Sequence, residues 1–426
     1  MLRRNENLWL AATMRFYNYY MRILLATSAI VPKGGGIASY NQELINAFRG
    51  IADFSVLTDE DIREFVGIDK VYSTFNHDCF SIDYCKEIVG CINNTRFDVI
   101  FNSGSLLMAI IAPYVNAPIC SVSHFVDGIL ALKAGFNSQY IARIIALSNY
   151  GKQHLEKRFS ISNKSCVKVV YNFVHTETVE LDKQKITKRP MVIVYPGGTS
   201  VKKSFDIVMK ALKKLIKTKL DFRFYWLGGT TLPSARFCLA SSCDKLIKYD
   251  SRVTFTGRIP REDAIRIMKS SNIFLLPSRG EGCPMTLLEA MQDGCIPVVS
   301  DAKHGSREIL EDGDFGVIVR NEDENSLYHA LCAILENADD YAINYQKSFE
   351  YTRRVLSEEK WRNSMLGIIN DCMAMRKKME SINEKHFRAN TRLIKTEIKK
   401  ERIATIFSSM KSCLICNWLY LTRYYD

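Results

Sequence analysis

Apolar and polar residues alternate along this chain with two different periods. Short apolar runs, such as residues 97–103 and 142–148, predict buried strands, whereas the stretch at 34–50 carries apolar side chains at helical spacing. The two kinds of segment succeed one another from residue 21 onward. This succession is typical of a parallel sheet covered by helices, so we predict an α/β fold.

The alternation is interrupted by a polar, charged stretch at residues 171–190 and then starts again. We therefore predict two Rossmann-like, doubly wound domains that face each other across an interdomain cleft, with ligands at the carboxyl ends of the strands. The predicted parts are an N-terminal extension at 1–20, a first domain at 21–172, a linker at 173–190, a second domain at 191–355, and C-terminal helices with a basic tail at 356–426.

Composition narrows the class of partner. The 426 residues suit two domains, and 47% hydrophobic with 24% charged residues is the balance of a soluble globular protein. The formal net charge is +12, and residues 371–426 hold twelve Lys and Arg against six Asp and Glu. This excess predicts an anionic partner. Because no nucleic-acid-binding module is recognisable, we expect a phosphorylated substrate or an anionic membrane surface rather than nucleic acid.

The cysteines and the longest apolar run add two expectations. Thirteen cysteines are scattered, and the close pair Cys413 and Cys416 has no second pair to complete a zinc site. We expect reduced thiols in a cytoplasmic protein. Polar residues interrupt the apolar run at 97–115, so no transmembrane helix is predicted.

The stretch at 277–299, PSRGEGCPMTLLEAMQDGCIPVV, points to chemistry. Pro284 suits the first position of a helix and Gly294 its end. The N-terminus of such a helix presents free N–H groups to a phosphate. Glu281 precedes the helix and Glu289 lies within it. Carboxylates aimed at phosphates would repel them, so we expect each to accept hydrogen bonds from hydroxyl groups on either side of a diphosphate, as in a sugar nucleotide.

This stretch resembles the Glu-x7-Glu signature of the retaining GT-B glycosyltransferases of family 4, the glycosyl transferases group 1. The matching positions are Pro277, Ser278, Glu281, Gly282, Leu288, Glu289, Ala290, Met291, Gly294, Pro297, Val298 and Val299. In that family the first glutamate contacts the transferred sugar and the second holds the ribose, which implies these roles for Glu281 and Glu289. The resemblance also implies that sugar and diphosphate lie against Gly282, Cys283, Pro284, Met285 and Thr286.

A second segment, YPGGTSVKK, resembles the family's lysine loop. Gly197 takes its leading glycine, and Lys203 takes the lysine that neutralises the departing diphosphate. Two positions depart from the pattern: Gly198 stands where the family has arginine, and Ser204 where it has glycine. Lys202 is the candidate for the missing cation.

Four further residues are implied by the resemblance, which covers about residues 21–355 and is thinner in the first domain. Gly35 and Gly36 follow the first strand and would approach the donor phosphates. His124 ends a strand and would lie near the reactive end of the sugar. The backbone around Arg258 would contact the nucleotide base.

The resemblance implies transfer of a hexose-type sugar from a nucleotide sugar to a glycan or lipid-linked acceptor, with retention of configuration. A UDP-sugar is favoured and GDP-mannose is possible. His124, Glu281 and Lys203 are the expected catalytic residues. The nucleotide sugar is a substrate, and neither a cofactor nor a metal is implied. Bacterial surface polysaccharide assembly, such as that of lipopolysaccharide or capsule, is the expected setting.

Alternatives remain open. A non-catalytic GT-B protein fits the replaced arginine, whereas the intact Glu281, Glu289 and Lys203 argue against it. An epimerase or phosphorylase of the same fold is the other alternative. The basic tail and the aromatic N-terminus suggest a cytoplasmic enzyme that rests peripherally on the inner face of the plasma membrane. The competing interpretation is a terminal helix packed on the body of the protein.

Overall fold

The computed structural model describes residues 20–30, 35–62, 68–126, 128–175, 185, 188–198, 201–228, 250–302, 305–375 and 379–421. The predicted N-terminal extension, apart from Tyr20, and most of the predicted linker lie outside these ranges. The described chain divides into two compact units, each assembled from several segments. One unit contains residues 1–122, 133–144 and 366–391, and the other contains residues 123–132, 145–365 and 392–426. The boundaries predicted from the sequence stay predictions.

The first sheet has seven strands in the order β3-β2-β1-β4-β5-β6-β7. The strands are β1 (Met21–Thr27), β2 (Ala52–Thr58), β3 (Lys70–Ser73), β4 (Val99–Ser103), β5 (Ile119–Ser123), β6 (Arg143–Ala146) and β7 (Val167–Val169). The α-helices between them are α2 (Gly36–Phe48), α3 (Ile82–Thr95), α4 (Leu106–Ile111), α5 (Gly128–Gly135) and α6 (Asn149–Arg158). The pairs β1–β2, β1–β4, β2–β3 and β4–β5 are parallel.

The second sheet has six parallel strands in the order β10-β9-β8-β11-β12-β13. The strands are β8 (Met191–Tyr195), β9 (Phe222–Leu227), β10 (Val253–Gly257), β11 (Ile273–Leu276), β12 (Ile296–Ser300) and β13 (Val317–Val319). The helices of this part are α7 (Phe205–Leu215), α10 (Arg261–Ser270), α11 (Met285–Gln292), α12 (Gly305–Ile309), α13 (Glu324–Glu336) and α14 (Ala342–Val355). Two helices follow, α15 (Glu358–Ala374) and α16 (Glu384–Leu421). The predicted α/β class with two Rossmann-like sheets is confirmed.

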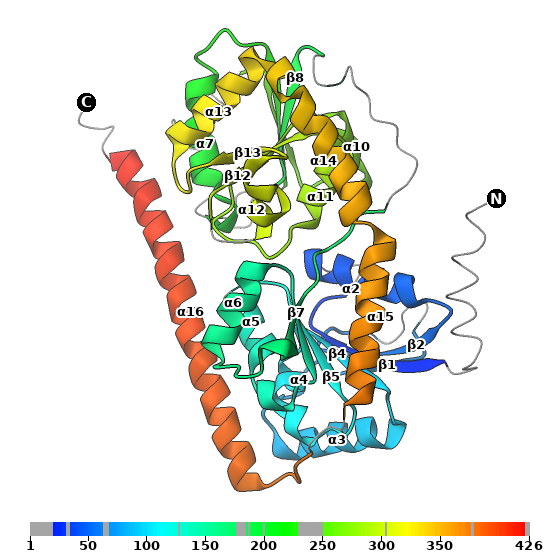
Figure 1. Ribbon diagram of the computed structural model, residues 1–426. Helices are drawn as coiled ribbons and strands as arrows, with labels where there is room; N and C mark the ends of the chain where they lie inside the picture. The colour runs from blue at the N-terminus through cyan, green and yellow to red at the C-terminus, as the bar shows by residue number, and fades with distance from the viewer. Residues whose placement is uncertain are drawn as a thin grey trace, which may run out of the picture. The chain divides into compact units, whose positions relative to one another are not determined.

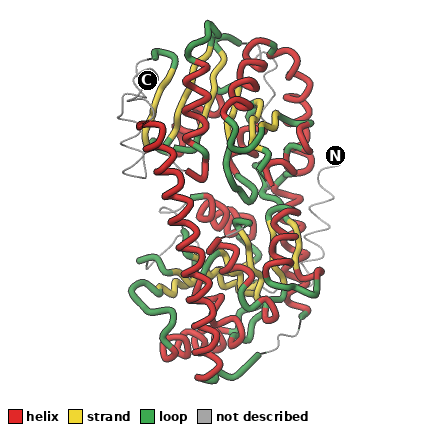
Figure 2. Tube along the Cα trace, turned by 90° about the vertical axis from the view of Figure 1, so that its left-hand side faces the viewer, coloured by secondary structure: helices red, strands yellow, loops and turns green. Residues whose placement is uncertain are grey.

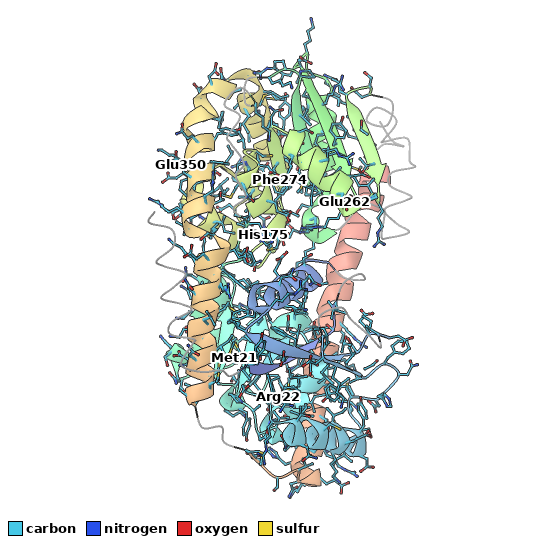
Figure 3. All side chains as sticks on the ribbon, turned by 90° about the vertical axis from the view of Figure 1, so that its right-hand side faces the viewer. Met21, Arg22, His175, Glu262, Phe274 and Glu350 are labelled. Atoms are coloured by element: carbon cyan, nitrogen blue, oxygen red, sulfur yellow. The ribbon has the colours of Figure 1, made fainter. Side chains whose placement is uncertain are left out.

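The second sheet is covered by helices on both faces (Figure 1). Alternate residues of β9, namely Phe222, Phe224 and Trp226, are fully buried in one core with apolar residues of α7 and α13. Phe274 of β11 is likewise buried, whereas Glu350 on α14 points away from the protein body (Figure 3). Strands lie between helices in both sheets (Figure 2). Burial on both faces explains why these strands read as nearly continuous apolar runs in the sequence.

Three local features differ from the sequence-based expectations. The apolar run at residues 21–31 predicts a first strand of that length, but the strand ends at Thr27. The short strands β3 and β7 carry half-exposed residues and therefore lack the apolar run that would reveal them. Pro284 precedes α11 as its N-cap in an extended conformation, so the helix proper begins at Met285.

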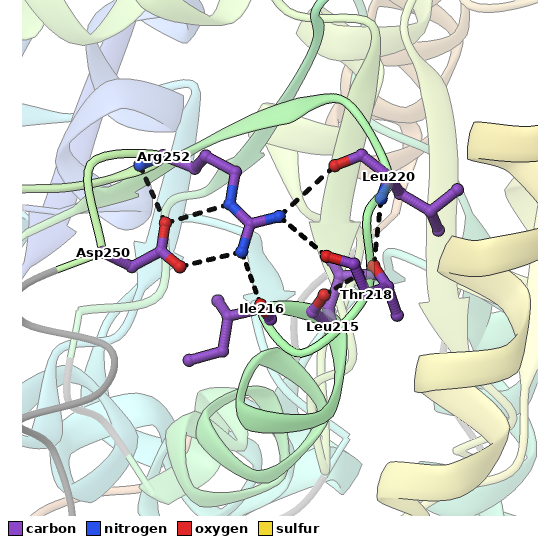
Figure 4. A network of polar contacts seen from close by, with 6 residues as sticks. All are labelled: Leu215, Ile216, Thr218, Leu220, Asp250 and Arg252. Atoms are coloured by element: carbon purple, nitrogen blue, oxygen red, sulfur yellow. Dashed lines mark hydrogen bonds and ion pairs between the residues drawn. The ribbon is translucent and has the colours of Figure 1, made fainter.

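A charged network binds the carbonyl groups at the C-terminal end of α7 (Figure 4). The guanidinium group of Arg252 donates to the carbonyl oxygens of Ile216 at 2.5 Å and Thr218 at 3.2 Å. It also donates to both carboxylate oxygens of Asp250, at 3.0 and 2.8 Å. The hydrogen bonds from Arg252 lower the pKa of Asp250. Arg252 thus satisfies carbonyl groups that the end of the helix leaves without intrahelical partners.

We predict that Arg252→Ala lowers the free energy of unfolding by about 1.5–3 kcal/mol, the range for hydrogen bonds to charged groups. Urea denaturation at neutral pH measures this. Arg266→Ala is the control, because its pair with Asp263 is exposed and such pairs contribute about 0–1 kcal/mol. Equal losses in the two variants would contradict the role of Arg252.

The same network has a pH signature. The folded pKa of Asp250 is below the unfolded value, so its contribution is present above the unfolded pKa and is lost as the pH falls through the folded pKa. The stability difference between wild type and Asp250→Asn should therefore shrink as the pH is lowered through that window.

Candidate functional site

Two oppositely charged side chains meet where strands of the second sheet end. Lys203 closes the short 3-10 helix η6 (Val201–Lys203) after β8, and Glu281 lies in the turn after β11. Nζ of Lys203 lies 2.5 Å from Oε1 of Glu281; their side chains are 31% and 7% exposed. The structure thus brings together two residues that the sequence predicts to be catalytic. An ammonium group has three donors, so a bond to Glu281 leaves capacity for a further anion.

Arg279 ties the turn after β11 to the neighbouring loops. Its guanidinium group donates to both carboxylate oxygens of Asp206 in the first turn of α7, at 2.9 and 2.8 Å, and to Glu322 at 2.6 Å. Its main-chain N–H donates to the carbonyl oxygen of Lys202 at 2.8 Å. Burial alone would lower the pKa of Arg279, but the two carboxylates outweigh burial and raise it. A bidentate arginine–carboxylate pair fixes geometry as well as charge, so the two loops are held in register.

The main chain at Lys203 is also anchored to β8. The hydroxyl group of the fully buried Tyr195 donates to the carbonyl oxygen of Lys203 at 2.9 Å. The Tyr195 ring packs edge-on against Trp226, with 4.9 Å between ring centroids. A side chain at Gly197 would overlap the hydroxyl end of the Tyr195 ring. Gly197 therefore supports the position of Lys203 by leaving space for that ring.

Gly282 lies at a close approach of three segments. A Cβ atom at Gly282 would overlap the main-chain oxygen of His124, which follows β5. A Cβ atom at Gly305, where α12 begins, would overlap the main-chain oxygen of Gly282. Backbone atoms cannot yield as a flexible side chain can, so both positions require glycine. The turn that carries Glu281 is consequently clamped between the end of β5 and the start of α12.

His124 is a neutral side chain in this structure. It is buried, and burial lowers its pKa to about 3. At neutral pH the imidazole therefore donates from one nitrogen and accepts at the other, and it contributes no positive charge. Its predicted contact with the reactive end of the sugar remains a prediction.

The remaining residues after Gly282 lead into α11. Asn172 donates from its main-chain N–H to Sγ of Cys283 at 3.3 Å, and from Nδ2 to the carbonyl oxygen of Cys283 at 2.5 Å. Burial raises the pKa of the Cys283 thiol to about 12, so this cysteine is not an ionised nucleophile. Pro284 caps α11, and the partly buried Met285 and Thr286 are its first two residues. Their main-chain N–H groups belong to the helix end that has no intrahelical acceptors.

Glu289 lies in the second turn of α11 and is paired. Nη2 of Arg261, the first residue of α10, donates to its Oε1 at 2.7 Å. The side chains are 61% exposed for Arg261 and 20% exposed for Glu289. A pair this exposed adds little stability, but it orients the carboxylate, which has room for several donors.

The two residues that depart from the lysine-loop pattern, Gly198 and Ser204, both have positive φ angles. Gly198 has a φ of +54°, so an arginine there would be strained. Its carbonyl oxygen accepts from the indole N–H of Trp226 at 2.9 Å. Ser204 has a φ of +58°, in the region where glycine fits best, and its buried hydroxyl oxygen has no hydrogen-bond partner among the described residues. Ser204 thus occupies a glycine position at some cost.

Lys202, the candidate for the missing cation, contacts an aromatic ring, and its role toward a ligand stays a prediction. Its Nζ lies 3.5 Å from the centroid of the Phe125 ring, so the ammonium group forms a cation–π contact. Phe125 follows His124 directly, which makes this contact a second link between the loop after β8 and the segment after β5.

Three further predicted contact residues stand on other elements. Gly35 caps α2 and Gly36 begins it, in the first compact unit; a Cβ atom at either position would meet no atom of a described residue within 4 Å. Arg258 is exposed just after β10. Their contacts with a ligand stay predictions. Among the described residues, no group of three or more His, Cys, Asp and Glu side chains is placed to hold a metal ion.

Sequence reasoning missed the residues that position the site: Arg279, Asp206, Asn172, Arg261 and Phe125. All of them except Asn172 lie close in the chain to a predicted residue, but each has its partner on a distant segment. Charged residues directly after predicted strands are the available signal, because the carboxyl ends of parallel strands lie along the same edge of a sheet. Arg279 follows β11, and Asp206 follows the lysine loop after β8.

Part of the chain is similar to a known protein family. Residues 190–337 match the family model of the glycosyl transferases group 1. A Campylobacter jejuni relative, N-acetylgalactosamine-N,N'-diacetylbacillosaminyl-diphospho-undecaprenol 4-alpha-N-acetylgalactosaminyltransferase, is 25% identical over 221 residues, which cover 49% of this chain and 58% of the relative. An amylovoran biosynthesis glycosyltransferase of Erwinia amylovora is 22% identical and covers 52% of this chain and 57% of the relative. The chain thus spans little more than half the length of these relatives.

Solved structures share the fold. HepE of Anabaena, solved in complex with UDP-glucose, superposes with a TM-score of 0.66 at 16% identity, covering 82% of this chain and all of that one (100%). At this identity the likeness shows the GT-B fold, two Rossmann-like sheets, and nothing finer.

We predict that Gly282→Ala lowers the free energy of unfolding by about 1–3 kcal/mol, because the added methyl group meets backbone that must shift. Gly280→Ala is the matched control: its Cβ would lie 3.7 Å from Cε of Lys202, an ordinary contact. Urea denaturation of both variants checks this. A Gly282→Ala protein as stable as Gly280→Ala would show that the clamp on this turn is not rigid.

Proposed function

Because the chain belongs to the glycosyl transferases group 1 family, we propose that it transfers a sugar from a nucleotide sugar to an acceptor with retention at the anomeric carbon. The observation that carries this proposal is the pairing of Lys203 with Glu281 beside the start of α11. One cation, one buried carboxylate and a helix N-terminus together suit a ligand that joins sugar hydroxyl groups to a diphosphate.

In this proposal each residue makes a distinct contact. Lys203 and the first N–H groups of α11 balance the charge that develops on the leaving diphosphate. Glu281, already holding Lys203, accepts hydrogen bonds from hydroxyl groups of the transferred sugar. Glu289 accepts from the ribose. His124 offers a neutral donor and acceptor near the transferred sugar.

The bond changes follow from retention without a covalent enzyme intermediate. The acceptor hydroxyl oxygen attacks the anomeric carbon on the face that the diphosphate leaves. The bond between the anomeric carbon and the phosphate oxygen breaks, and the departing phosphate oxygen takes the acceptor's proton. Cys283 is excluded as a nucleophile by the raised pKa of its thiol.

Donor and acceptor follow by analogy. HepE was solved with UDP-glucose, which supports a UDP-sugar as the first donor to test, with GDP-mannose as the second. The Campylobacter jejuni relative acts on a diphospho-undecaprenol-linked glycan, which supports a lipid-linked or glycan acceptor and a place in bacterial surface polysaccharide assembly. Thermal shift with a panel of nucleotide sugars identifies the donor before any acceptor is known.

With the donor identified, we predict separate effects for two variants. Lys203→Ala should lower kcat by about 10²–10³-fold, since it removes a charge that acts mainly on the leaving group. Glu289→Ala should weaken donor binding by about tenfold to a hundredfold, the equivalent of a charged hydrogen bond.

Glu262→Ala is the matched control, because Glu262 is an exposed glutamate in the first turn of α10 (Figure 3). Steady-state kinetics or donor hydrolysis measures all three variants. If the donor binds but neither transfer nor hydrolysis occurs with any acceptor tested, the protein is a non-catalytic binder, the alternative that Gly198 favours. Unchanged donor binding in Glu289→Ala would refute the ribose contact.

We also propose that α16 brings the enzyme to an anionic membrane surface. One face of the helix packs, with Ile394 fully buried and Glu401 bonded to Arg158 at 2.5 Å. The other face exposes Arg392, Lys395, Lys399 and Arg402 at helical spacing. The two interpretations of the tail are therefore compatible, because packing and basic exposure use different faces. Among the helices that the structure describes, none is both long and apolar enough to cross a membrane.

Charge reversal tests this surface. We predict that the double variant Lys399→Glu with Arg402→Glu loses at least about tenfold in affinity for vesicles containing anionic lipid, since each basic residue contributes about 1 kcal/mol there. The double variant Lys217→Glu with Lys219→Glu changes the net charge equally on exposed residues after α7 and should bind normally. Vesicle flotation at low and high salt measures both. Equal loss in the two variants would mean that overall charge, not α16, governs binding.

A further inference from the structure

A hollow of about 360 Å³ opens at the amino ends of β8, β9 and β11, the edge of the second sheet opposite to Lys203 and Glu281. Its lining residues all belong to one compact unit. They are Lys185, Lys188, Arg189, Pro190, Val192, Arg223, Tyr225, Lys269, Ser270 and Asn272.

Half of these lining residues are cations, and none is acidic. Lys188, Arg223 and Lys269 are exposed, and none of them forms an ion pair with a carboxylate among the described residues. Lys185 and Arg189 donate to carbonyl oxygens, Lys185 to that of Asp293 at 2.6 Å. Like charges gathered around one hollow raise the local positive potential, and a bound anion relieves their mutual repulsion.

The floor of the hollow is held by Asn272. This residue is 4% exposed, and its side-chain oxygen accepts from the main-chain N–H of Val192 at 2.6 Å. Its side-chain nitrogen donates to the carbonyl oxygen of Lys185. The main-chain N–H of Asn272 donates to the carbonyl oxygen of Val192 at 2.8 Å. The amide therefore joins Lys185 to the start of the sheet, so the hollow is built on hydrogen-bonded backbone rather than on loose surface side chains.

Asp293 is an acid close enough to interact with this cluster. It caps the C-terminus of α11, and burial raises the pKa of its carboxyl group to about 6 while Lys269 and Lys185 act to lower it. One carboxylate offsets only part of five positive charges. The cluster keeps a net positive charge at neutral pH.

We propose that this hollow binds a small soluble molecule with two or more phosphate charges, at a site separate from the sugar-nucleotide site. Lys188, Arg223 and Lys269 supply the charged donors. Tyr225 lies partly exposed beside Arg223 on β9 and presents a ring against which a sugar or base can pack. The volume suits a sugar phosphate or a short polyphosphate rather than a macromolecule.

The test uses the full chain and inorganic tripolyphosphate as the probe, with binding measured by isothermal titration calorimetry at low ionic strength. The pocket variant is Arg223→Glu with Lys269→Glu, both exposed positions where folding should tolerate the change. We expect it to lose at least about tenfold in affinity, the scale of one charged hydrogen bond or more. The control Lys217→Glu with Lys219→Glu should stay within about twofold of wild type, since it repeats the charge change outside the hollow.

Lys203→Ala separates this site from the other anion site. We expect tripolyphosphate to bind Lys203→Ala through the hollow. Binding should disappear completely only in the protein that combines Lys203→Ala with the pocket variant, because that protein lacks both anion sites. Binding lost with Lys203→Ala alone, or lost equally in pocket and control variants, would overturn the proposal. So would a wild-type protein that binds no tripolyphosphate. None of these outcomes depends on sugar transfer, so the glycosyltransferase proposal stands or fails separately.

Discussion

The bidentate pair between Arg279 and Asp206 is the contact on which the site geometry depends most. Lys203 and Glu281 stand on loops that follow different strands, and a lysine side chain has little preferred geometry of its own. Arg279 joins these loops through both its side chain and its main-chain N–H. The pair is largely buried, with side chains 21% and 10% exposed. Solvent therefore screens this pair less than it screens the exposed ion pairs on α10 and α16. Its burial is compensated further by Glu322, which accepts from Nε of Arg279 at 2.6 Å.

Backbone contacts also hold the loops that carry Lys203 and Glu281. Gly282 and Gly305 let three segments approach without side chains between them, and Tyr195 ties the lysine loop to the centre of the sheet. These constraints act on the main chain, where displacement is costly. A flexible turn could carry the same residues, but it would lose entropy each time a ligand bound. Holding the turn in advance removes much of that loss.

Sequence patterns predicted the fold and part of the candidate site for clear physical reasons. Strands buried on both faces leave apolar runs, so the alternation with helices was readable, whereas β3 and β7 were too short and too exposed to be seen. Glu281 and Lys203 were found because they lie in recognisable local motifs. Arg279 was missed because its role depends on Asp206, 73 positions away, and no local pattern records such a pairing. The clamp on Gly282 was invisible for the same reason: a glycine in a sequence does not show which backbone approaches it.

The contact of Trp226 with the lysine loop has an optical consequence. Its indole N–H is bonded to Gly198, and its ring packs against Tyr195, whose hydroxyl group is bonded to Lys203. Trp226 is fully buried, so its optical signal depends on the protein groups around it rather than on solvent. Any movement of the loop that follows β8 must alter the hydrogen bond of this indole or the packing of its ring. The protein thus carries an intrinsic chromophore, sensitive in near-ultraviolet circular dichroism, in direct contact with the segment that holds its principal cation.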